Sequence, residues 1–333
     1  MLSPVAEVSN ISGIPSSAGS GIRPAAAIER RAALAMILAP GPHPAGEREV
    51  GDFLRIAEQR RLDLGQLVLS LQNAKINWAI LPILTPGRTL LLLAPNHVIP
   101  PMTLEAGESL TRAVLARHSD CLLAQVLVEP ACLAVRDLYL ALGFLEIAEL
   151  IYMHVPVRRP KAIIPLPDEF YLQTYTPQTH ELFAQAIRAS YQESLDCPGL
   201  NGLRDIEDVI LGHQAAGGMG GLSEFEPRLW RVLLHRQNNA PPQPCGVLLL
   251  CRTDPHDSME LVYIGLAPAV RRRGLGKFLV QEALIAAADE NRRRITLAVD
   301  ARNLPALQMY YRHGFQRIGT KVAYIKDLRV TAS

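Results

Sequence analysis

The chain has 333 residues, of which 49% are apolar and 20% charged, and its 34 Lys and Arg against 32 Asp and Glu give a formal net charge of +2. This length exceeds what one hydrophobic core usually supports, so we expect two domains, and the composition excludes a small disulfide-stapled scaffold and a disordered chain. A net charge so close to zero excludes an overall positive electrostatic potential that could attract nucleic acid or an anionic membrane. We expect neither partner.

The apolar runs are too short for a membrane span, because a transmembrane helix needs ~18 consecutive apolar residues. Residues 1–20 are rich in Ser, Pro and Gly and lack a charged start followed by an apolar stretch, so we expect a flexible tail and not a signal peptide. We therefore expect a cytoplasmic protein. The five cysteines form no C-x-x-C pair, so we expect reduced, packed cysteines and no bound metal.

The elements expected from hydrophobic periodicity and turn residues fall into two similar sets, each reading strand, two helices and three strands. The first set comprises a strand at 21–26, helices at 27–38 and 47–60, and strands at 65–71, 76–84 and 89–94. The second comprises a strand at 170–174, helices at 179–191 and 204–214, a glycine loop at 217–221, and strands at 230–236, 246–252 and 261–266.

The chain also contains an internal repeat, the usual sign of a duplicated fold. A shift of 171 residues aligns 124–153 with 295–324 without a gap, and each stretch reads strand, polar turn, short helix ending in Gly-Phe, then strand. Six of the thirty aligned positions are identical: Val128 and Val299, Leu133 and Leu304, Tyr139 and Tyr310, Gly143 and Gly314, Phe144 and Phe315, and Ile147 and Ile318. The repeat predicts a tandem duplication.

The stretch at 155–168 separates the two sets and contains four prolines, which is a linker composition. We therefore predict a flexible tail at 1–20, an N-terminal domain at 21–154, a linker at 155–168 and a C-terminal domain at 169–330. Helices mixed with strands in both halves predict an α/β (α+β) fold.

A glycine-containing turn follows the last strand of the second set. The strand ends at Leu266, and Arg271-Arg272-Arg273-Gly274-Leu275-Gly276-Lys277 then leads into a helix. Glycines let the backbone approach a ligand closely, and the free N–H groups at a helix N-terminus bind anions, so this turn could hold a pyrophosphate. The spacing is not G-x-x-x-x-G-K-[ST] and Phe278 follows Lys277, which excludes a P-loop NTPase.

This turn, together with the later Asn303-Leu304-Pro305-Ala306, Tyr310 and Gly314-Phe315, resembles the GNAT family of N-acetyltransferases. The first element matches that family's [Q/R]-x-x-G-x-[G/A] acyl-CoA loop and the second its N-x-x-A…Y…G-F segment. Among tandem-domain members, the stretch from Glu260 to Pro268 is most similar to mycothiol synthases. The resemblance implies two tandem GNAT folds, each a mixed, mostly antiparallel sheet flanked by helices, with acetyl-CoA as co-substrate.

The reaction that the resemblance implies requires an acid and a base. An amine attacks a thioester only when deprotonated, and Glu260 stands near the start of the strand expected beside the acetyl group, so it is the predicted base. Tyr310 occupies the family's position for the acid that protonates the departing sulfur; its neighbour Tyr311 is the rival. The predicted acyl-CoA-binding residues are Ile264, Gly265, Leu266, Arg271, Arg272, Arg273, Gly274, Leu275, Gly276, Lys277 and Asn303.

The acceptor site is expected in the connection between the first two helices of the second half, as in the family. Its polar, acidic and aromatic residues are Tyr191, Glu193, Asp196 and Asn201. Glu193 and Asp196 would hold a cationic amine. The alternative is an ordinary connection in which Asp196 or Asn201 caps a helix.

The first half departs from the family pattern at the corresponding turn. Pro95 to Thr103 contains no glycine, and Pro100 and Pro101 remove N–H donors that a pyrophosphate would need. Gly87 and Arg88 stand where the second half has Glu260, so the base is missing too. The N-terminal half is therefore predicted to be a degenerate, non-catalytic copy.

These observations predict an acyl-CoA-dependent N-acyltransferase, most simply one that moves acetyl to a primary amine of a small molecule in a ternary complex. Two alternatives stay open: acetylation of a protein lysine or N-terminus, and a non-catalytic acyl-CoA-binding sensor. We expect a monomer or a homodimer. The sequence does not identify the acceptor.

Overall fold

The computed structural model describes residues 21–59, 61–200, 204–215, 223–237, 240–253 and 257–329. The predicted tail at 1–20, the glycine loop at 217–221 and residue 330 at the end of the predicted C-terminal domain lie outside these ranges. Within them, no helix is both long enough and apolar enough to cross a membrane.

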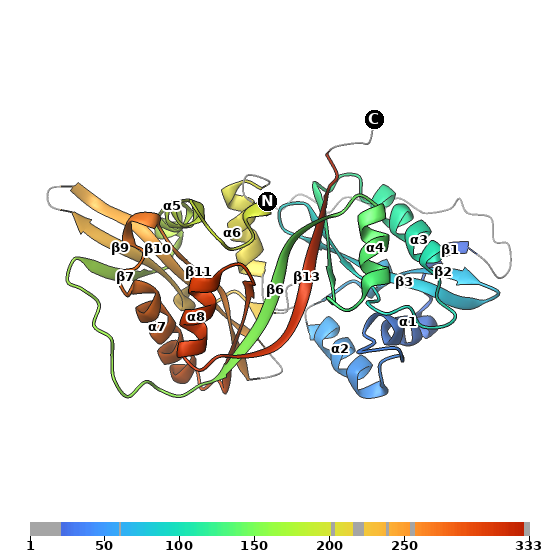
Figure 1. Ribbon diagram of the computed structural model, residues 1–333, viewed down its shortest axis with the longest axis horizontal. Coiled ribbons are helices and arrows are strands. Elements are labelled where there is room, and N and C mark those ends of the chain that lie inside the picture. The colour runs from blue at the N-terminus through green and yellow to red at the C-terminus, as the bar shows by residue number, and fades with distance from the viewer. Residues whose placement is uncertain are drawn as a thin grey trace, which may run out of the picture.

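One continuous sheet runs through the described part of the chain (Figure 1). Its order is β1-β2-β3-β4-β5-β13-β6-β12-β11-β10-β9-β7, and the short β8 pairs with β10. Neighbours are antiparallel except for two parallel pairs, β4 with β5 and β11 with β12. The predicted fold class, a mixed and mostly antiparallel sheet flanked by helices, is confirmed. The strands are β1 (Gly21–Pro24), β2 (Val68–Gln72), β3 (Lys75–Thr85), β4 (Thr89–Leu93), β5 (Leu123–Val128), β6 (Leu145–Pro156), β7 (Phe170–Thr174), β8 (Ser223–Glu224), β9 (Trp230–Gln237), β10 (Ala240–Thr253), β11 (Ser258–Leu266), β12 (Arg294–Asp300) and β13 (Gln316–Asp327).

In the N-terminal half, helices cover both faces of the sheet, so its strands are apolar on both sides. On β3, Trp78 and Ile80 face the core under α3 and α4, whereas Ala79 and Leu81 face the core under α1 and α2. In the C-terminal half, α7 and α8 cover one face and α5 and α6 the other. The helices are α1 (Arg30–Ile37), α2 (Glu47–Gln59), α3 (Leu104–Arg117), α4 (Leu133–Ala141), α5 (His180–Tyr191), α6 (Ile206–Ala215), α7 (Leu275–Asp289) and α8 (Leu304–Arg312).

The predicted internal repeat is visible in the element bounds. Helices α4 and α8 begin and end at aligned positions, and so do strands β6 and β13. The rings of Tyr139 and Phe144 lie 5.3 Å apart, centre to centre, and those of the aligned Tyr310 and Phe315 lie 5.4 Å apart. The two halves therefore share one packing plan as well as one order of elements.

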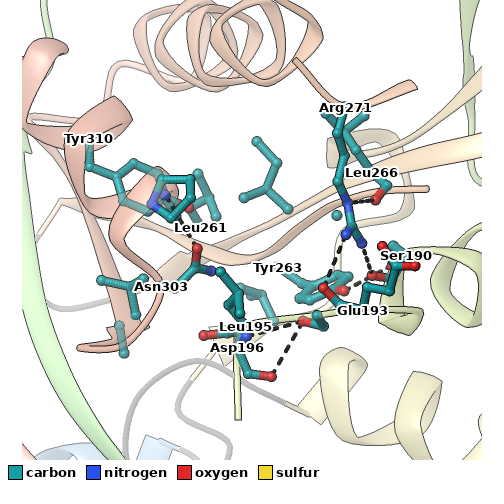
Figure 2. Close-up of a pocket in the computed structure, with 18 residues that line it drawn as sticks. Ser190, Glu193, Leu195, Asp196, Leu261, Tyr263, Leu266, Arg271, Asn303 and Tyr310 are labelled. Atoms are coloured by element: carbon teal, nitrogen blue, oxygen red, sulfur yellow. Dashed lines mark hydrogen bonds between the residues drawn. The ribbon is translucent and has the colours of Figure 1, made fainter. Parts of the chain in front are cut away.

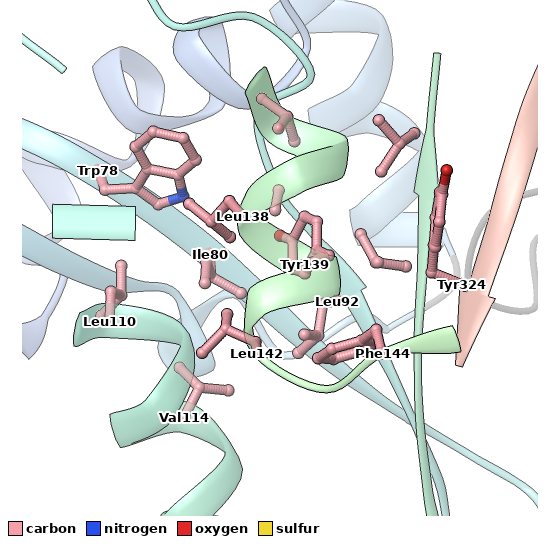
Figure 3. Packing of buried hydrophobic residues seen from close by; sticks show 14 of the residues in the cluster. Trp78, Ile80, Leu92, Leu110, Val114, Leu138, Tyr139, Leu142, Phe144 and Tyr324 are labelled. Atoms are coloured by element: carbon pink, nitrogen blue, oxygen red, sulfur yellow. The ribbon is translucent and has the colours of Figure 1, made fainter. Parts of the chain in front are cut away.

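The last strand of each half pairs with the other half. β13, from the C-terminus, lies between β5 and β6, and β6 in turn pairs with β12 (Figure 1). The side chain of Tyr324 on β13 is 1% exposed and completes the N-terminal core (Figure 3). Met153 on β6 is 0% exposed and lies in the C-terminal core. Each core therefore needs a strand from the other half of the chain.

This pairing corrects one predicted boundary. Val155 and Pro156 were expected in the linker, but they are the last residues of β6, because that strand continues along β12 as far as Arg294. The division into domains at 21–154 and 169–330 stays a prediction, and the strand exchange makes the stability of each half depend on the other.

Candidate active site

The cleft that carries the candidate site opens where two parallel strands separate. β11 and β12 are paired only at Ser258, Met259 and Glu260, although β11 continues to Leu266 and β12 to Asp300. A cavity of about 190 Å³ lies in the gap and is lined by Ile264, Gly265 and Leu266. The three backbone positions predicted to bind the acyl group therefore lie at the cavity wall (Figure 2).

Tyr310 projects from α8 into this cavity. Its side chain is 4% exposed, and burial, with a smaller contribution from the charge of Asp196, raises the pKa of the phenol above its ordinary value. The hydroxyl therefore stays protonated at neutral pH, as a proton donor must. Tyr311, the rival acid, is 51% exposed and does not line the cavity.

Asp196 lies between two cavities and lines both of them. It lines the 190 Å³ cleft and also a larger cavity of about 680 Å³, and Val262 and Tyr263 line both as well. Burial raises the pKa of Asp196, opposed by a hydrogen bond from the backbone N–H of Asp300 and reinforced by the negative charge of Asp300. A carboxylate with a raised pKa between two cavities is well placed to accept a proton.

Glu260, the predicted base, forms the last pair of β11 with β12, opposite Thr296. It lines neither of the two cavities described above. Burial, with a smaller contribution from the charge of Glu260, raises the pKa of Tyr152 on β6 to about 12. The role of Glu260 as a base stays a prediction.

Arg271 fastens the predicted acyl-CoA loop to α5. Its guanidinium donates to the backbone oxygens of Leu266 (2.9 Å), Ser190 (3.0 Å) and Glu193 (3.1 Å) (Figure 2). It also donates to the backbone oxygen of Gln192 at 2.6 Å. Four donated bonds leave little of this side chain for a phosphate. Arg271 is thus placed to shape the cleft wall, where it also contributes to the lining.

The rest of the loop divides into residues held by the protein and residues facing outward. Arg273 pairs with Glu169 at 2.6 Å and lies over the ring of Phe170. Arg272 and Lys277 are exposed. Gly274 has φ of +83°, a left-handed conformation that glycine adopts without strain, and it directly precedes the first turn of α7.

Two more predicted cofactor residues pack the start of α7. A Cβ on Gly276 would lie 3.0 Å from Sδ of Met309 on α8, so glycine keeps the two helices close. Leu275 is buried beneath the loop, and Asn303 lines the cleft while its side chain accepts the N–H of Ala306 and caps α8.

The larger cavity is lined by residues of the expected acceptor connection and of α6. The ring of Tyr191 contacts Tyr263 edge-on at 5.7 Å, and His213 stacks on Tyr263 at 5.1 Å. Burial, aided by the charge of Arg204, lowers the pKa of His213 to about 4, so this ring is neutral at physiological pH. Glu193 lines the smaller cleft instead, and Asn201 lies outside the described residues.

The sequence analysis did not single out Tyr263, His213 or Arg204 for this cavity. Tyr263 is an aromatic residue within an apolar strand, a pattern that also fits core packing. Ser190, on the last turn of α5, is hydrogen-bonded to Tyr263 at 2.9 Å. A Cβ added to Gly265 would lie 2.5 Å from Oγ of Ser190, so this glycine lets α5 approach the cleft wall. Gly265 is visible in the sequence, but its role depends on contact with Ser190, which the sequence alone does not report.

The corresponding place in the N-terminal half is built differently. Thr103, aligned with Gly274, caps α3 through its hydroxyl, which accepts the N–H of Ala106, and its own N–H donates to Asn77. An acidic residue, Glu105, follows in the first turn. Tyr139, aligned with Tyr310, is 0% exposed within the core (Figure 3). Two N–H groups that could bind a pyrophosphate are therefore already paired within the protein, and the negative charge of Glu105 would repel the anion.

Comparison with known proteins agrees with this geometry. Residues 221–315 match the model of the acetyltransferase (GNAT) family. A mycothiol acetyltransferase from Jonesia denitrificans is 37% identical over 65 residues, which are 19% of this chain and 21% of that protein. The match thus spans about a fifth of the length of the curated relative.

Solved structures extend the likeness to the whole chain. A GCN5-related N-acetyltransferase from Sphaerobacter thermophilus, 18% identical, has a TM-score of 0.64 and covers 94% of this chain and 96% of its own. A tandem GNAT protein from the clavulanic acid biosynthesis pathway, 16% identical, has a TM-score of 0.52 and covers 94% and 99%. At these identities the likeness shows the fold alone. The chain therefore has the tandem GNAT fold, and residues 221–315 in its C-terminal half match the acetyltransferase (GNAT) family.

Proposed function

We propose that this chain is an acyl-CoA-dependent N-acyltransferase that moves acetyl from acetyl-CoA to the primary amine of a small molecule. The observation that carries the proposal is the cleft between the separated strands β11 and β12, which Tyr310 and Asp196 both line. The second cavity shares Asp196 with that cleft as a lining residue, so two substrates bound in the two cavities would both lie beside this carboxyl group.

Asp196 would take a proton from the ammonium group of the acceptor, either directly or through a water molecule. The free amine would then attack the thioester carbonyl. A new carbon–nitrogen bond would form, and the carbon–sulfur bond of the thioester would break. Backbone N–H groups along Ile264 to Leu266 would stabilise the negative charge on the carbonyl oxygen by hydrogen bonding. As the adduct collapses, Tyr310 would give its proton to the departing sulfur, which leaves as a thiol. The nitrogen would lose its second proton to the Tyr310 oxygen, directly or through water, which yields the neutral amide and restores the tyrosine hydroxyl, and Asp196 would release its proton to solvent.

The larger cavity favours an acceptor that carries an acidic group besides its amine. Arg204 lines it, and among the described residues its Nε is buried without a hydrogen-bond partner. A guanidinium in this state can bind a carboxylate or phosphate of the acceptor. Asp196, which lines both cavities, would then contact the amine at the other end of the acceptor.

The alternative acceptor, a protein lysine or N-terminus, requires a groove that admits a polypeptide. The cavity volume of about 680 Å³ is typical of a small-molecule site, which favours the small acceptor. The sensor alternative requires the loop at Gly274 but neither Asp196 nor Tyr310.

The test is acetyl transfer to a pooled library of amines, with and without a carboxylate or phosphate, read by mass spectrometry. We expect acetylated products enriched in acidic amines, and Arg204→Gln should reduce that enrichment. Tight acetyl-CoA binding with no product from small amines or peptides would favour the sensor. Preferential acetylation of peptides would refute the small-molecule acceptor.

A further inference from the structure

Three potential metal ligands come together in the N-terminal half, outside the candidate active site. His97, Glu129 and Cys132 each offer one ligand atom, and these atoms all lie within 4.8 Å of one another. Sγ of Cys132 is 3.6 Å from Nδ1 and 3.8 Å from Nε2 of His97. Nε2 of His97 is in turn 3.5 Å from a carboxylate oxygen of Glu129.

The cluster lies where the acyl cleft would lie if this half had kept it. His97 follows β4, and Glu129 and Cys132 follow β5, the second parallel pair in the sheet. The repeat aligns Cys132 with Asn303. Asn303 uses its side chain to cap α8, whereas Cys132, at the start of α4, makes no capping hydrogen bond and its Sγ is directed toward His97.

The backbone holds the two turns together. Oδ1 of Asn96 accepts the N–H of Glu129 at 2.7 Å, which ties the His97 turn to the Glu129 turn. The N–H of Cys132 donates to the carbonyl oxygen of Glu129 at 2.9 Å, which fixes the spacing of those two ligands. The ligand positions are thus set by the fold before any ion binds, which lowers the cost of binding.

Lys321, on the exchanged strand β13, orients the carboxylate. Its Nζ lies 2.7 Å from Oε1 of Glu129, while Oε2 of Glu129 faces His97. One oxygen is therefore held by a cation and the other is presented to the cluster. Partners of this kind, outside the ligands themselves, commonly orient ligands in metal sites.

Two of the separations are close to those of ligands around one tetrahedral ion, and all three ligand atoms lie within 4.8 Å of one another. Zinc bonds of ~2.3 Å to sulfur and ~2.0 Å to nitrogen or oxygen, at tetrahedral angles, place ligand atoms about 3.3–3.6 Å apart. The distances of 3.5 and 3.8 Å that Nε2 of His97 makes to Glu129 and Cys132 are close to this range. A thiol, an imidazole and a carboxylate form a ligand set typical of zinc.

We propose that His97, Glu129 and Cys132 bind a divalent zinc ion, with water as the fourth ligand. The side chains of His97 and Glu129 are 22% and 33% exposed, so water can reach the open position. The ion would clamp the ends of β4 and β5 and, through Lys321, the strand β13.

This proposal departs from the sequence expectation of no metal, which rested on the absence of C-x-x-C. His97 and Cys132 are 35 positions apart and on different turns, a spacing that no short motif reports. The signal that remained was the pair of potential ligands Glu129 and Cys132 within one turn.

Cobalt substitution tests the proposal on the full chain. Metal-free protein is titrated with Co²⁺, and binding of one equivalent should produce a sulfur-to-cobalt charge-transfer absorption and the visible bands of tetrahedral cobalt, both removed by Zn²⁺. Cys132→Ser should abolish the charge-transfer band. His97→Gln, at a partly exposed side chain, should weaken Co²⁺ binding by roughly 10-fold or more with the fold retained.

The matched control is Cys121→Ser, because Cys121 is a buried cysteine in the same core but outside the cluster. It should keep both the band and the affinity. In parallel, Zn²⁺ should raise the thermal midpoint of the native chain and of the control, but not of His97→Gln. Absence of a charge-transfer band at one equivalent of Co²⁺, or its persistence in Cys132→Ser, would overturn the site.

Discussion

Asp196 and Asp300 hold each other's chain segment in place. Oδ1 of Asp196 accepts the backbone N–H of Asp300 at 3.1 Å, and Oδ2 of Asp300 accepts the N–H of Cys197, the residue after Asp196, at 3.1 Å. Burial opposes ionisation of both and raises the pKa of Asp196. For Asp300, hydrogen bonds from Arg302 and Cys197 and the charge of Arg302 together outweigh burial, so its pKa is lowered. Asp196 is therefore the carboxyl group of the pair that gains a proton first as the pH falls.

The first prediction concerns this proton. Asp196→Asn keeps an oxygen for the N–H of Asp300 but removes the base, so kcat/KM at neutral pH should fall by roughly 10² to 10⁴. In the native enzyme kcat/KM should fall as the pH drops through the raised pKa of Asp196, and the variant should lack that acidic limb. The measurement is a pH profile of kcat/KM.

Glu260→Gln is the paired variant, because Glu260 is the rival base. We expect it to keep the acidic limb. If Glu260→Gln loses the limb and Asp196→Asn retains it, the assignment is reversed.

The raised pKa also means that the ionised form of Asp196 lowers the free energy of unfolding. The stabilisation that the protonated form provides is fully present below ~3.9 and is lost as the pH rises through the raised pKa of the folded protein. Asp196→Asn should therefore not destabilise the protein at neutral pH.

The second prediction separates the acid from its neighbour. Tyr310→Phe removes the proton for the leaving sulfur and should lower kcat by roughly 10² or more, with the affinity for acetyl-CoA intact. Tyr311→Phe should leave kcat unchanged, because Tyr311 is exposed and outside the cleft. Steady-state kinetics and equilibrium binding of both variants check this, and equal rates in the two would exclude Tyr310 as the acid.

The third prediction divides the predicted acyl-CoA loop. Arg272→Ala and Lys277→Ala should each raise the Kd for acetyl-CoA roughly two- to fivefold at low salt, and less at high salt, because exposed charge pairs contribute ~0.5–1 kcal/mol and are screened. Arg273→Ala should leave the Kd unchanged, since that side chain is paired with Glu169. A salt-independent loss in the first two variants would argue against direct phosphate contact.

The fourth prediction concerns the strand exchange. Met153→Ala empties a buried site in the C-terminal core and should lower the free energy of unfolding by about 2–5 kcal/mol. Because the cores share strands, both halves should unfold in one transition. The two tryptophans, Trp78 and Trp230, are buried in different halves, so Trp78→Phe and Trp230→Phe provide one fluorescent reporter each.

In denaturant titrations, the two reporters should give coincident transitions that shift together in Met153→Ala. Two separate transitions, with only the C-terminal one shifted, would instead support independently folding domains at 21–154 and 169–330.

The sequence predicted those parts of the fold that depend on neighbouring residues. Gly274 and Gly276 mark the turn before α7, and the repeat ending in Gly143-Phe144 and Gly314-Phe315 fixed the tandem plan. It did not predict the exchange of β6 and β13, because β13 pairs with β5 and β6, and β6 with β12, which are all far apart in the sequence, and no local pattern reports such partners.

The site shows the same division. Tyr310 and the residues Ile264 to Leu266, which local motifs predicted, line the cleft. The position of Asp196 between the two cavities depends instead on contacts with Asp300, which is 104 positions away in the sequence. The residues that surround His213 and Arg204 are likewise assembled by packing of α6, which no local pattern reports.

The central claim is that acyl-CoA chemistry takes place in the C-terminal half only, and titration calorimetry of the full chain with acetyl-CoA tests it most directly. We predict one site per chain, lost in Gly274→Pro, because proline cannot adopt φ of +83°, and retained in Thr103→Ala at the aligned position. Thermal unfolding of both variants establishes that they are folded. Two equivalent sites, or one site that survives Gly274→Pro and disappears in Thr103→Ala, would contradict the account.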